Sequence, residues 1–287
     1  MSGPEHDDPD ELRAEQREGW ERSADGWNAT SARFNAATMP VSRWLVDAIH
    51  PQPGQRVLEL AAGIGETGFL AAELIQPGGT LVSTDGAEAM VAHARARAEQ
   101  LGLRNVEFKP VDLEWIDART AEFDAVLCRW GYMFALDRDA ALRETRRVLR
   151  PGGRLALATW TESGRNPWAM VTRAALYDAG LVGELELPSP GPFDLPTAVV
   201  VTELLEEAGF TDVVCDEVEL RFPFDGVDDL FADVAARSRA FADLAASLDA
   251  RQLDDLRARI AEQAEPYRTA DGGVTLPGVA LVAAADA

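Results

Sequence analysis

The stretch Arg56–Ile75, which reads R-V-L-E-L-A-A-G-I-G-E-T-G-F-L-A-A-E-L-I, constrains the fold more than any other part of the chain. It opens with the apolar run Val57–Leu60, which is typical of a buried parallel strand. Three glycines follow, Gly63, Gly65 and Gly68, and then an apolar segment with helical spacing. A strand, a glycine-rich turn and a helix in this order can cradle a ligand, because glycine lets the backbone approach closely and the helix start has free N–H groups. The alternative is a tight turn that holds no ligand.

Two classes of ligand fit this cradle. The spacing Gly63-x-Gly65-x-x-Gly68 fits a dinucleotide site, and Asp85 follows Gly63 by 22 positions, where an acid would grip a ribose. Read from Glu59, the same residues are similar to the E/D-x-G-x-G-x-G signature of class I S-adenosylmethionine-dependent methyltransferases. Ala61 then stands in place of the first glycine of that signature.

Glu59 separates the two ligands. A carboxylate inside a buried strand is costly unless it meets a partner. A nicotinamide dinucleotide offers none there, whereas the methionine end of S-adenosylmethionine carries an ammonium group. The sequence therefore favours S-adenosylmethionine as the cofactor, with S-adenosylhomocysteine as the product.

Two later segments strengthen the resemblance. Residues 123–127, F-D-A-V-L, resemble the fourth-strand motif of the family, whose end faces the reacting methyl group. Residues 141–155, A-L-R-E-T-R-R-V-L-R-P-G-G-R-L, resemble the ubiquinone/menaquinone-type branch, which acts on small molecules. The resemblance covers roughly residues 40–160. It implies an α/β, Rossmann-like doubly wound sheet of about seven strands with the last strand antiparallel.

The rest of the chain is divided by composition and periodicity. Residues 1–11 are polar and are expected to form a disordered tail. Residues 12–50 have a helical pattern rich in aromatic residues and are expected to form an N-terminal helical lid. Residues 51–287 form the methyltransferase domain, with two amphipathic helices inserted at 227–262, before the last strand.

The resemblance also implies roles for individual residues. Asp85, at the end of the second strand, would hold the ribose, although Asp is also a good helix N-cap. Asp112 would accept a hydrogen bond from the adenine amino group, and Trp27 is the candidate aromatic of the lid. The full set of expected cofactor-binding residues is Trp27, Glu59, Ala61, Gly63, Gly65, Asp85, Gly86, Met90, Val111, Asp112, Leu113 and Arg129.

The acceptor pocket is expected beside the cofactor. Ligands of open α/β sheets lie at the carboxyl ends of the strands, and Trp130 and Trp160 follow the fourth and fifth strands directly. Tyr132 and Trp168 are close to them in the sequence. These four residues are expected to bind an apolar or aromatic substrate, with plain core packing as the alternative.

Charge and cysteine content limit the partners. The net charge of −22 disfavours nucleic acid, whose phosphates would be repelled. The two cysteines, Cys128 and Cys215, lie far apart and outside any metal-binding pattern, so no metal site is expected. No apolar run approaches the length of a membrane span, and the start of the chain lacks a signal-peptide pattern. A cytoplasmic protein without membrane or nucleic-acid partners is expected.

The chain is therefore predicted to be a methyltransferase for a small molecule. Its three histidines, His6, His50 and His93, fall outside the segments expected at the methyl group, so no catalytic base is assigned. One alternative is an NAD(P)-dependent oxidoreductase, which is disfavoured because no Tyr-x-x-x-Lys pair exists and Lys109 is the sole lysine. The other is a protein that binds S-adenosylmethionine without catalysis.

Overall fold

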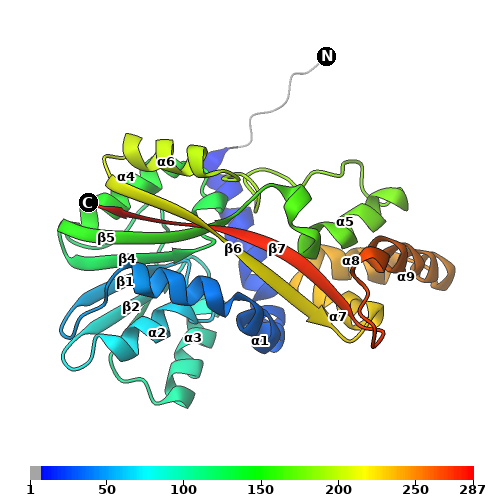
Figure 1. Ribbon diagram of the computed structural model, residues 1–287, viewed down its shortest axis with the longest axis horizontal. Helices are drawn as coiled ribbons and strands as arrows, with labels where there is room; N and C mark the ends of the chain where they lie inside the picture. Colours follow the sequence, from blue (N-terminus) through cyan, green and yellow to red (C-terminus); the bar gives the residue numbers. More distant parts are fainter. Residues whose placement is uncertain (1–7) are drawn as a thin grey trace.

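A seven-stranded mixed sheet forms the centre of the computed structural model, which describes residues 8–287 (Figure 1). The strand order is β3-β2-β1-β4-β5-β7-β6. Strands β1 to β5 run parallel, and β7 lies antiparallel between β5 and β6. The expected doubly wound sheet with an antiparallel last strand is confirmed. The strands are β1 (Arg56–Leu60), β2 (Thr80–Asp85), β3 (Val106–Pro110), β4 (Phe123–Arg129), β5 (Leu149–Trp160), β6 (Thr211–Phe224) and β7 (Val274–Asp286).

Helices pack on the strands that they connect. Helix α2 contacts β1 and β2, α3 contacts β2 and β3, α4 contacts β5, and α6 contacts β6 and β7. Helix α5 contacts β7 and also α9 of the helical insertion. These helices are α2 (Thr67–Leu74), α3 (Glu88–Leu101), α4 (Arg138–Val148), α5 (Pro167–Asp178) and α6 (Ala198–Glu207).

The centre of the sheet is the core of the molecule. In β4, every residue from Ala125 to Cys128 is at most 1% exposed, and in β7 every residue from Ala280 to Ala285 is at most 2% exposed. Such strands are covered on both faces, which explains why their sequences are continuous apolar runs rather than alternating ones. The order places β1 beside β4, so the turns after these two strands open at the same edge of the sheet.

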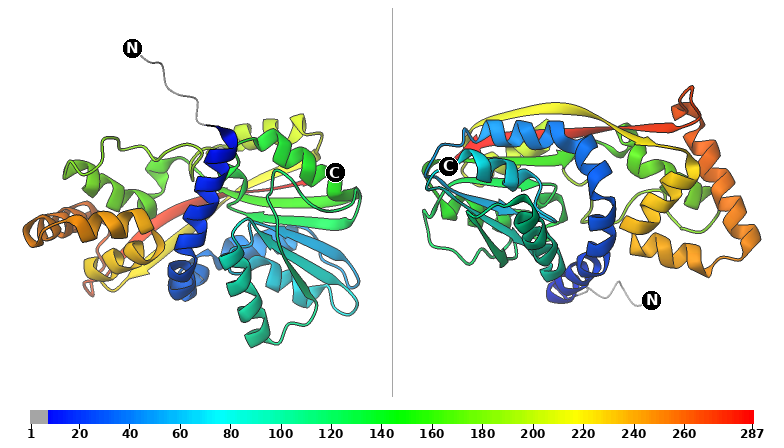
Figure 2. Two further views of the ribbon diagram at one scale, coloured as in Figure 1. Left: turned by 180° about the vertical axis from the view of Figure 1, so that it is seen from behind. Right: turned by 90° about the horizontal axis from the view of Figure 1, so that it is seen from below.

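Helix α1 (Pro9–Ala48) is 40 residues long and bends, as Figure 2 shows. Pro40 lies inside it, and a proline interrupts the helical hydrogen-bond ladder and bends the helix. The expected N-terminal helical segment is thus one helix, which contacts α2 and α3 on one side and α7 and β6 on the other. The expected tail falls mainly on residues 1–7, which lie outside the described residues, while residues 9–11 are helical.

The insertion before the last strand holds three helices, where two were expected. They are α7 (Val227–Arg237), α8 (Arg239–Ser247) and α9 (Ala250–Ala264). The extra break is at Ser238, whose backbone is extended and whose hydroxyl caps α8 by accepting from the Phe241 N–H. Because the break is a single residue long, the helical spacing of the apolar residues continues almost unchanged across it. The sequence pattern therefore did not reveal two separate helices. Strands β6 and β7 run on past the rest of the sheet to reach these helices (Figure 1).

Two glycines of α1 make a testable pair. A Cβ at Gly26 would lie 1.6 Å from the carbonyl oxygen of Ala236 in α7, whereas a Cβ at Gly19 would meet nothing within 4 Å. We expect Gly26→Ala to lower the free energy of unfolding by about 1–3 kcal/mol, since α1 and α7 must separate. Gly19→Ala is the control and should raise it by about 1 kcal/mol through helix propensity. Urea unfolding of both variants checks this, and a stabilised Gly26→Ala protein would contradict the close contact.

Candidate functional site

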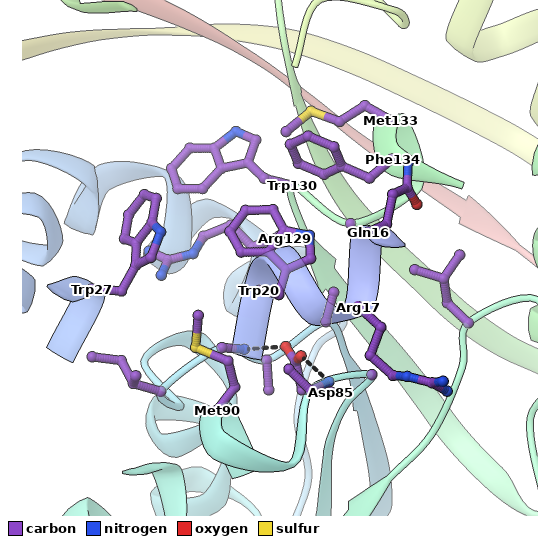
Figure 3. Close-up of a pocket in the computed structure, with 18 of the residues that line it drawn as sticks. Gln16, Arg17, Trp20, Trp27, Asp85, Met90, Arg129, Trp130, Met133 and Phe134 are labelled. Carbon is purple, nitrogen blue, oxygen red and sulfur yellow. Dashed lines mark hydrogen bonds between the residues drawn. The ribbon is translucent and has the colours of Figure 1, made fainter. Parts of the chain in front are cut away.

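A cavity of about 650 Å³ lies at the carboxyl ends of β1, β2 and β4, under helix α1. Its wall is formed by the turns after these strands, the segment after β3, the first two thirds of α1, the end of β5 and the start of α5. In Figure 3, Asp85 and Met90 lie toward one end of the cavity and Trp130, Met133 and Phe134 toward the other. Trp20 and Trp27 of α1 lie between them (Figure 3). One cavity thus joins a polar half to an aromatic half.

The three glycines of the turn after β1 have different roles. Gly63 lines the cavity with a positive φ of 55°, and open space lies where a Cβ would stand. Gly65, with φ 74°, packs against Phe69, whose ring would lie 2.4 Å from an added Cβ, and it is not part of the cavity wall. Gly68 starts α2 so close to Glu59 that a Cβ would lie 2.2 Å from Glu59 Oε2. Only the first glycine therefore leaves its backbone open to a ligand.

Glu59 has partners within the chain. Its side chain is buried and accepts hydrogen bonds from the Gly68 N–H at 2.6 Å and the Ser83 hydroxyl at 3.0 Å. Burial raises the pKa of Glu59 to about 7, although both hydrogen bonds and the nearby Arg129 act in the opposite direction. Glu59 therefore does not depend on a ligand for its first partners, and its contact with the ammonium group of a cofactor stays a prediction. Glu59 nevertheless lines the cavity.

Asp85 connects the two turns of the polar half. Its Oδ2 accepts from the Gly63 N–H at 2.8 Å, and its Oδ1 accepts from the Ala87 N–H at 3.0 Å. Burial raises the pKa of Asp85, and these amide hydrogen bonds lower it. The alternative of an N-cap does not hold, because α3 has Ala87 as its N-cap residue. Each carboxylate oxygen retains acceptor capacity toward the cavity that it lines.

Helix α1 supplies contacts that the sequence did not predict. The Glu21 carboxylate accepts from the N–H groups of Glu88 at 2.6 Å and Ala89 at 2.9 Å, so a residue of α1 caps the start of α3. Arg13 forms an ion pair with Glu114 at 2.7 Å. These contacts hold α1 over the polar half of the cavity. A negatively charged side chain that caps a distant helix leaves no local signature, so sequence could not reveal it.

A buried polar stripe on α1 faces the turn after β1 and Arg129. Asn35 donates to Glu66 at 2.6 Å, and Arg129 Nη1 donates to the hydroxyls of Thr38 at 3.1 Å and Ser42 at 2.9 Å. The three α1 residues are at most 7% exposed, and their spacing of three to four residues places them on one helix face. Burial lowers the pKa of Arg129 to about 10, while Glu66 and Glu59 raise it.

The aromatic half is built from a column of stacked rings. Trp130 stacks on Trp160 with centroids 4.5 Å apart and an interplanar angle of 6°. Trp160 lies 4.7 Å from Trp168, which lies 5.1 Å from Phe222. Phe34 of α1 contacts Trp130 edge-to-face at 5.6 Å. Trp130, Trp160 and Trp168 all line the cavity, as the sequence led us to expect.

Tyr132 does not line the cavity, and the prediction that it binds the substrate is wrong. Its side chain is 1% exposed, and its hydroxyl forms a 2.6 Å hydrogen bond with the Thr145 hydroxyl of α4. The short 3-10 helix Tyr132–Phe134 has three residues per turn, so its side chains point in different directions: Tyr132 points into the core, and Met133 and Phe134 line the cavity. Two direct neighbours of Tyr132 thus line the cavity in its place.

Most of the other predicted residues do meet in the cavity. Of the predicted cofactor-binding residues, Gly65 is the one absent from its wall. Contact of the remainder with a cofactor stays a prediction. Those lining the cavity are Trp27, Glu59, Ala61, Gly63, Asp85, Gly86, Met90, Val111, Asp112, Leu113 and Arg129.

The cavity wall, within residues 8–287, contains no histidine. His50 lies before β1, and His93 pairs with Asp25 of α1 at 2.8 Å, while His6 lies outside the described residues. Over the same residues, His, Cys, Asp and Glu form no cluster suited to a metal ion. No helix of the described part is long and apolar enough to cross a membrane.

Comparisons with known proteins agree on one family. Residues 57–153 match the family model described as a methyltransferase domain. The chain is 31% identical over 217 residues to nocamycin O-methyltransferase of Saccharothrix syringae, covering 71% of this chain and 76% of that protein. It is 34% identical over 185 residues to demethylmenaquinone methyltransferase of Beutenbergia cavernae, covering 60% of this chain and 72% of that one.

Two further comparisons bear on length and fold. The chain spans 44% of the length of three uncharacterized mycobacterial proteins, which it matches at 38% identity over 125 residues. The crystal structure of the YcgJ protein from Bacillus subtilis has a TM-score of 0.55 and 15% identity, covering 85% of this chain and 97% of that one. At this identity the likeness concerns the fold alone.

The raised pKa of Glu59 predicts how stability changes with pH. The folded protein holds the Glu59 proton more tightly than the unfolded chain, so this contribution to stability is complete below about pH 4.5 and is lost as the pH rises through about 7. Glu59→Gln retains both hydrogen bonds if the Ser83 hydroxyl reverses, and it carries no charge. We therefore expect the free energy of unfolding of the wild type to fall relative to this variant between pH 5.5 and 8, by on the order of 2 kcal/mol.

Denaturant unfolding across this pH range measures the effect. Glu73→Gln, on the exposed face of α2, is the control for loss of a carboxylate at the surface. A difference between wild type and Glu59→Gln that stays constant with pH would contradict the assignment.

Proposed function

The chain belongs to the class I S-adenosylmethionine-dependent methyltransferases, and we propose that it methylates a small apolar or aromatic metabolite held in the aromatic half of the cavity. The observation that carries the proposal is the continuity of this cavity. The glycine turn at Gly63 and the stacked rings of Trp130 and Trp160 line the same space of about 650 Å³. A cofactor in the polar half and a planar acceptor in the aromatic half would therefore be direct neighbours.

The residues of the polar half suit the cofactor. An added Cβ would meet nothing within 4 Å at Gly63 or at Gly86, so both turns leave their backbone open to a ligand. Asp85 offers carboxylate oxygens to the ribose hydroxyls, and Asp112 offers an acceptor to the adenine amino group. Arg129 offers a half-buried guanidinium to the carboxylate of the methionine end. S-adenosylmethionine, when bound, supplies a methyl group activated by a positively charged sulfur.

The chain's own part in methyl transfer is to bind, orient and exclude water. When a protein holds two reactants at attack distance, their reaction becomes effectively intramolecular. This positioning can supply a large part of the rate increase over the bimolecular reaction in water. Helix α1 covers the cavity and is fixed to α3 by Glu21 and to Glu66 by Asn35. It thus keeps solvent from the donor and the acceptor while leaving both halves of the cavity connected.

The aromatic lining supports a flat, apolar acceptor. The indole N–H groups of Trp130 and Trp168 are already used, since they donate to the carbonyl oxygen of Thr159 at 3.3 Å and to Asn166 Oδ1 at 3.2 Å. The rings therefore offer apolar surface rather than hydrogen-bond donors. A planar molecule buries more of its area against such walls than a compact polar one does.

Binding measurements test the proposal. Calorimetry with S-adenosylhomocysteine, S-adenosylmethionine and NADH should show binding of the two adenosyl ligands and no response to NADH. Incubation with S-adenosylmethionine and a panel of aromatic acceptors should then yield S-adenosylhomocysteine. Binding of the adenosyl ligands without turnover on any acceptor would favour a non-catalytic binding protein, and tight binding of NADH alone would refute the proposal.

Asp85 provides the sharpest single test of the cofactor site. Asp85→Ala should weaken S-adenosylhomocysteine about tenfold or more, since hydrogen bonds to a charged acceptor contribute roughly 1.5–3 kcal/mol. The variant should also unfold more easily, because the amides of Gly63 and Ala87 lose their acceptor. Asp137→Ala is the matched control, since Asp137 likewise accepts from a backbone N–H, that of Ala140 at 2.8 Å, but does not line the cavity. Equal affinities in the two folded variants would reduce Asp85 to a structural residue.

A further inference from the structure

The aromatic half of the cavity fits two opposite kinds of acceptor. A cluster of tryptophans can bind an ammonium group, because a cation is attracted to the electron-rich face of a ring. The same cluster can bind a flat conjugated molecule by stacking and edge contacts. The two differ in which part of each ring is free, and the described residues decide between them.

The ring faces of the column are already occupied. Trp130 has Trp160 stacked 4.5 Å away, and the Arg129 guanidinium lies 4.9 Å over its ring. Two groups this close cannot share one face, so they cover opposite faces of Trp130. Its edge is left for the cavity, and ring edges carry the positive end of the aromatic quadrupole. An ammonium ion would meet a positive edge there, whereas an electron-rich π system or an anion would be attracted.

A second guanidinium acts on the other rings. The guanidinium carbon of Arg237 lies 5.2 Å from the ring centre of Trp27, 5.7 Å from that of Phe34 and 5.9 Å from that of Trp168. All three rings line the cavity, and Arg237 does not. A cation held against an aromatic ring uses up part of its attraction for a further cation. Three of the rings that could cage an ammonium ion are thus already engaged with this arginine.

Acidic residues accompany these arginines behind the rings. Arg237 is paired with Asp233 of α7, and Arg33 contacts both Asp229 at 2.8 Å and Asp233 at 3.6 Å. Arg129 donates to two neutral hydroxyls and has Glu66 and Glu59 as nearby acidic groups. Although the chain as a whole has a net charge of −22, the charged groups stacked on these rings are guanidinium groups.

From these contacts we infer that the acceptor is a planar conjugated oxygen acid, such as an aryl carboxylate or an enolate, and not an amine. The inference rests on the proposed methyltransferase function and narrows its substrate class. A delocalised anion costs less to remove from water than a localised one, which suits an apolar cavity. The cavity walls then favour an acceptor that is both negatively charged and planar.

The reaction balances for such an acceptor. The anionic oxygen gives an electron pair to the methyl carbon, and the carbon–sulfur bond breaks with its pair going to sulfur. The oxygen–carbon bond replaces it, the sulfonium becomes a neutral thioether, and the anion becomes a neutral ester or enol ether. No proton is released, so the acceptor needs no base from the protein at this step.

Matched probes of opposite charge test the inference by binding alone. Calorimetry is carried out with the full chain saturated with S-adenosylhomocysteine, which carries no sulfonium charge. The probes are 2-naphthoate and 2-naphthyltrimethylammonium, which share one ring system. We expect naphthoate to bind at least about tenfold more tightly. Tighter binding of the ammonium probe, or no binding of naphthoate, would overturn the inference.

Two variants of the Asp233–Arg237 pair change the charge behind the rings in opposite directions. Asp233→Asn leaves Arg237 without its counterion and should increase the preference for naphthoate severalfold. The double variant Arg237→Gln/Asp233→Asn removes both charges of the pair and should decrease it severalfold. Circular dichroism and thermal unfolding confirm that each variant is folded. A preference that is the same in the wild type and both variants would overturn the role of Arg237.

Turnover separates this inference from the proposed function. With S-adenosylmethionine, 1-hydroxy-2-naphthoate should be methylated on oxygen, and 2-naphthylamine should not be methylated. Methylation of the amine in place of the oxygen acid would overturn the inference and leave the methyltransferase function standing. Failure to bind either adenosyl ligand would instead remove the proposed function itself.

Discussion

The site depends on two carboxylates that hold the glycine turn by its backbone N–H groups. Glu59 at the end of β1 accepts from Gly68, and Asp85 at the end of β2 accepts from Gly63. Glu59 is buried and Asp85 is half-buried, and burial raises the pKa of both acids. The glycine turn, which follows β1, is therefore held in place by residues of the chain itself. This fixed turn is what makes the polar half of the cavity a preformed site.

Helix α1 covers that edge of the sheet and forms one wall of the cavity. It is anchored at both halves of the site, through Glu21 on the start of α3 and through Arg33 on Asp229 of α7. Its buried face carries Asn35, Thr38 and Ser42, which would be poor choices for a helix that merely covered a core. They are tolerated because each meets a polar partner, as buried polar groups must. Closure of the cavity and orientation of Arg129 therefore depend on the same helix.

In the aromatic half of the cavity, the charged side chains beside the tryptophans bear on which kind of acceptor these rings can bind. A group of tryptophans beside a cofactor site is compatible with an apolar, a cationic or an anionic acceptor. Stacking of Trp130 on Trp160 and the guanidinium groups of Arg129 and Arg237 occupy faces of Trp130, Trp27, Phe34 and Trp168 that a cation would otherwise use. The selectivity that we propose thus arises from what lies behind the rings and not from the rings alone.

The sequence by itself determined the sheet, its glycine turn and the edge at which the site lies. These follow from local patterns: apolar runs form buried strands, and Gly63, Asp85 and Trp130 stand at the carboxyl ends of three strands that are adjacent in the sheet. Only the tertiary structure decided which side chains contact one another. It gave Glu59 a neighbour in Gly68, turned Tyr132 into the core, and brought Arg237 against Trp27 from more than 200 residues away along the chain. Which way a side chain points and what charge faces it depend on packing between distant segments, and no local pattern encodes that.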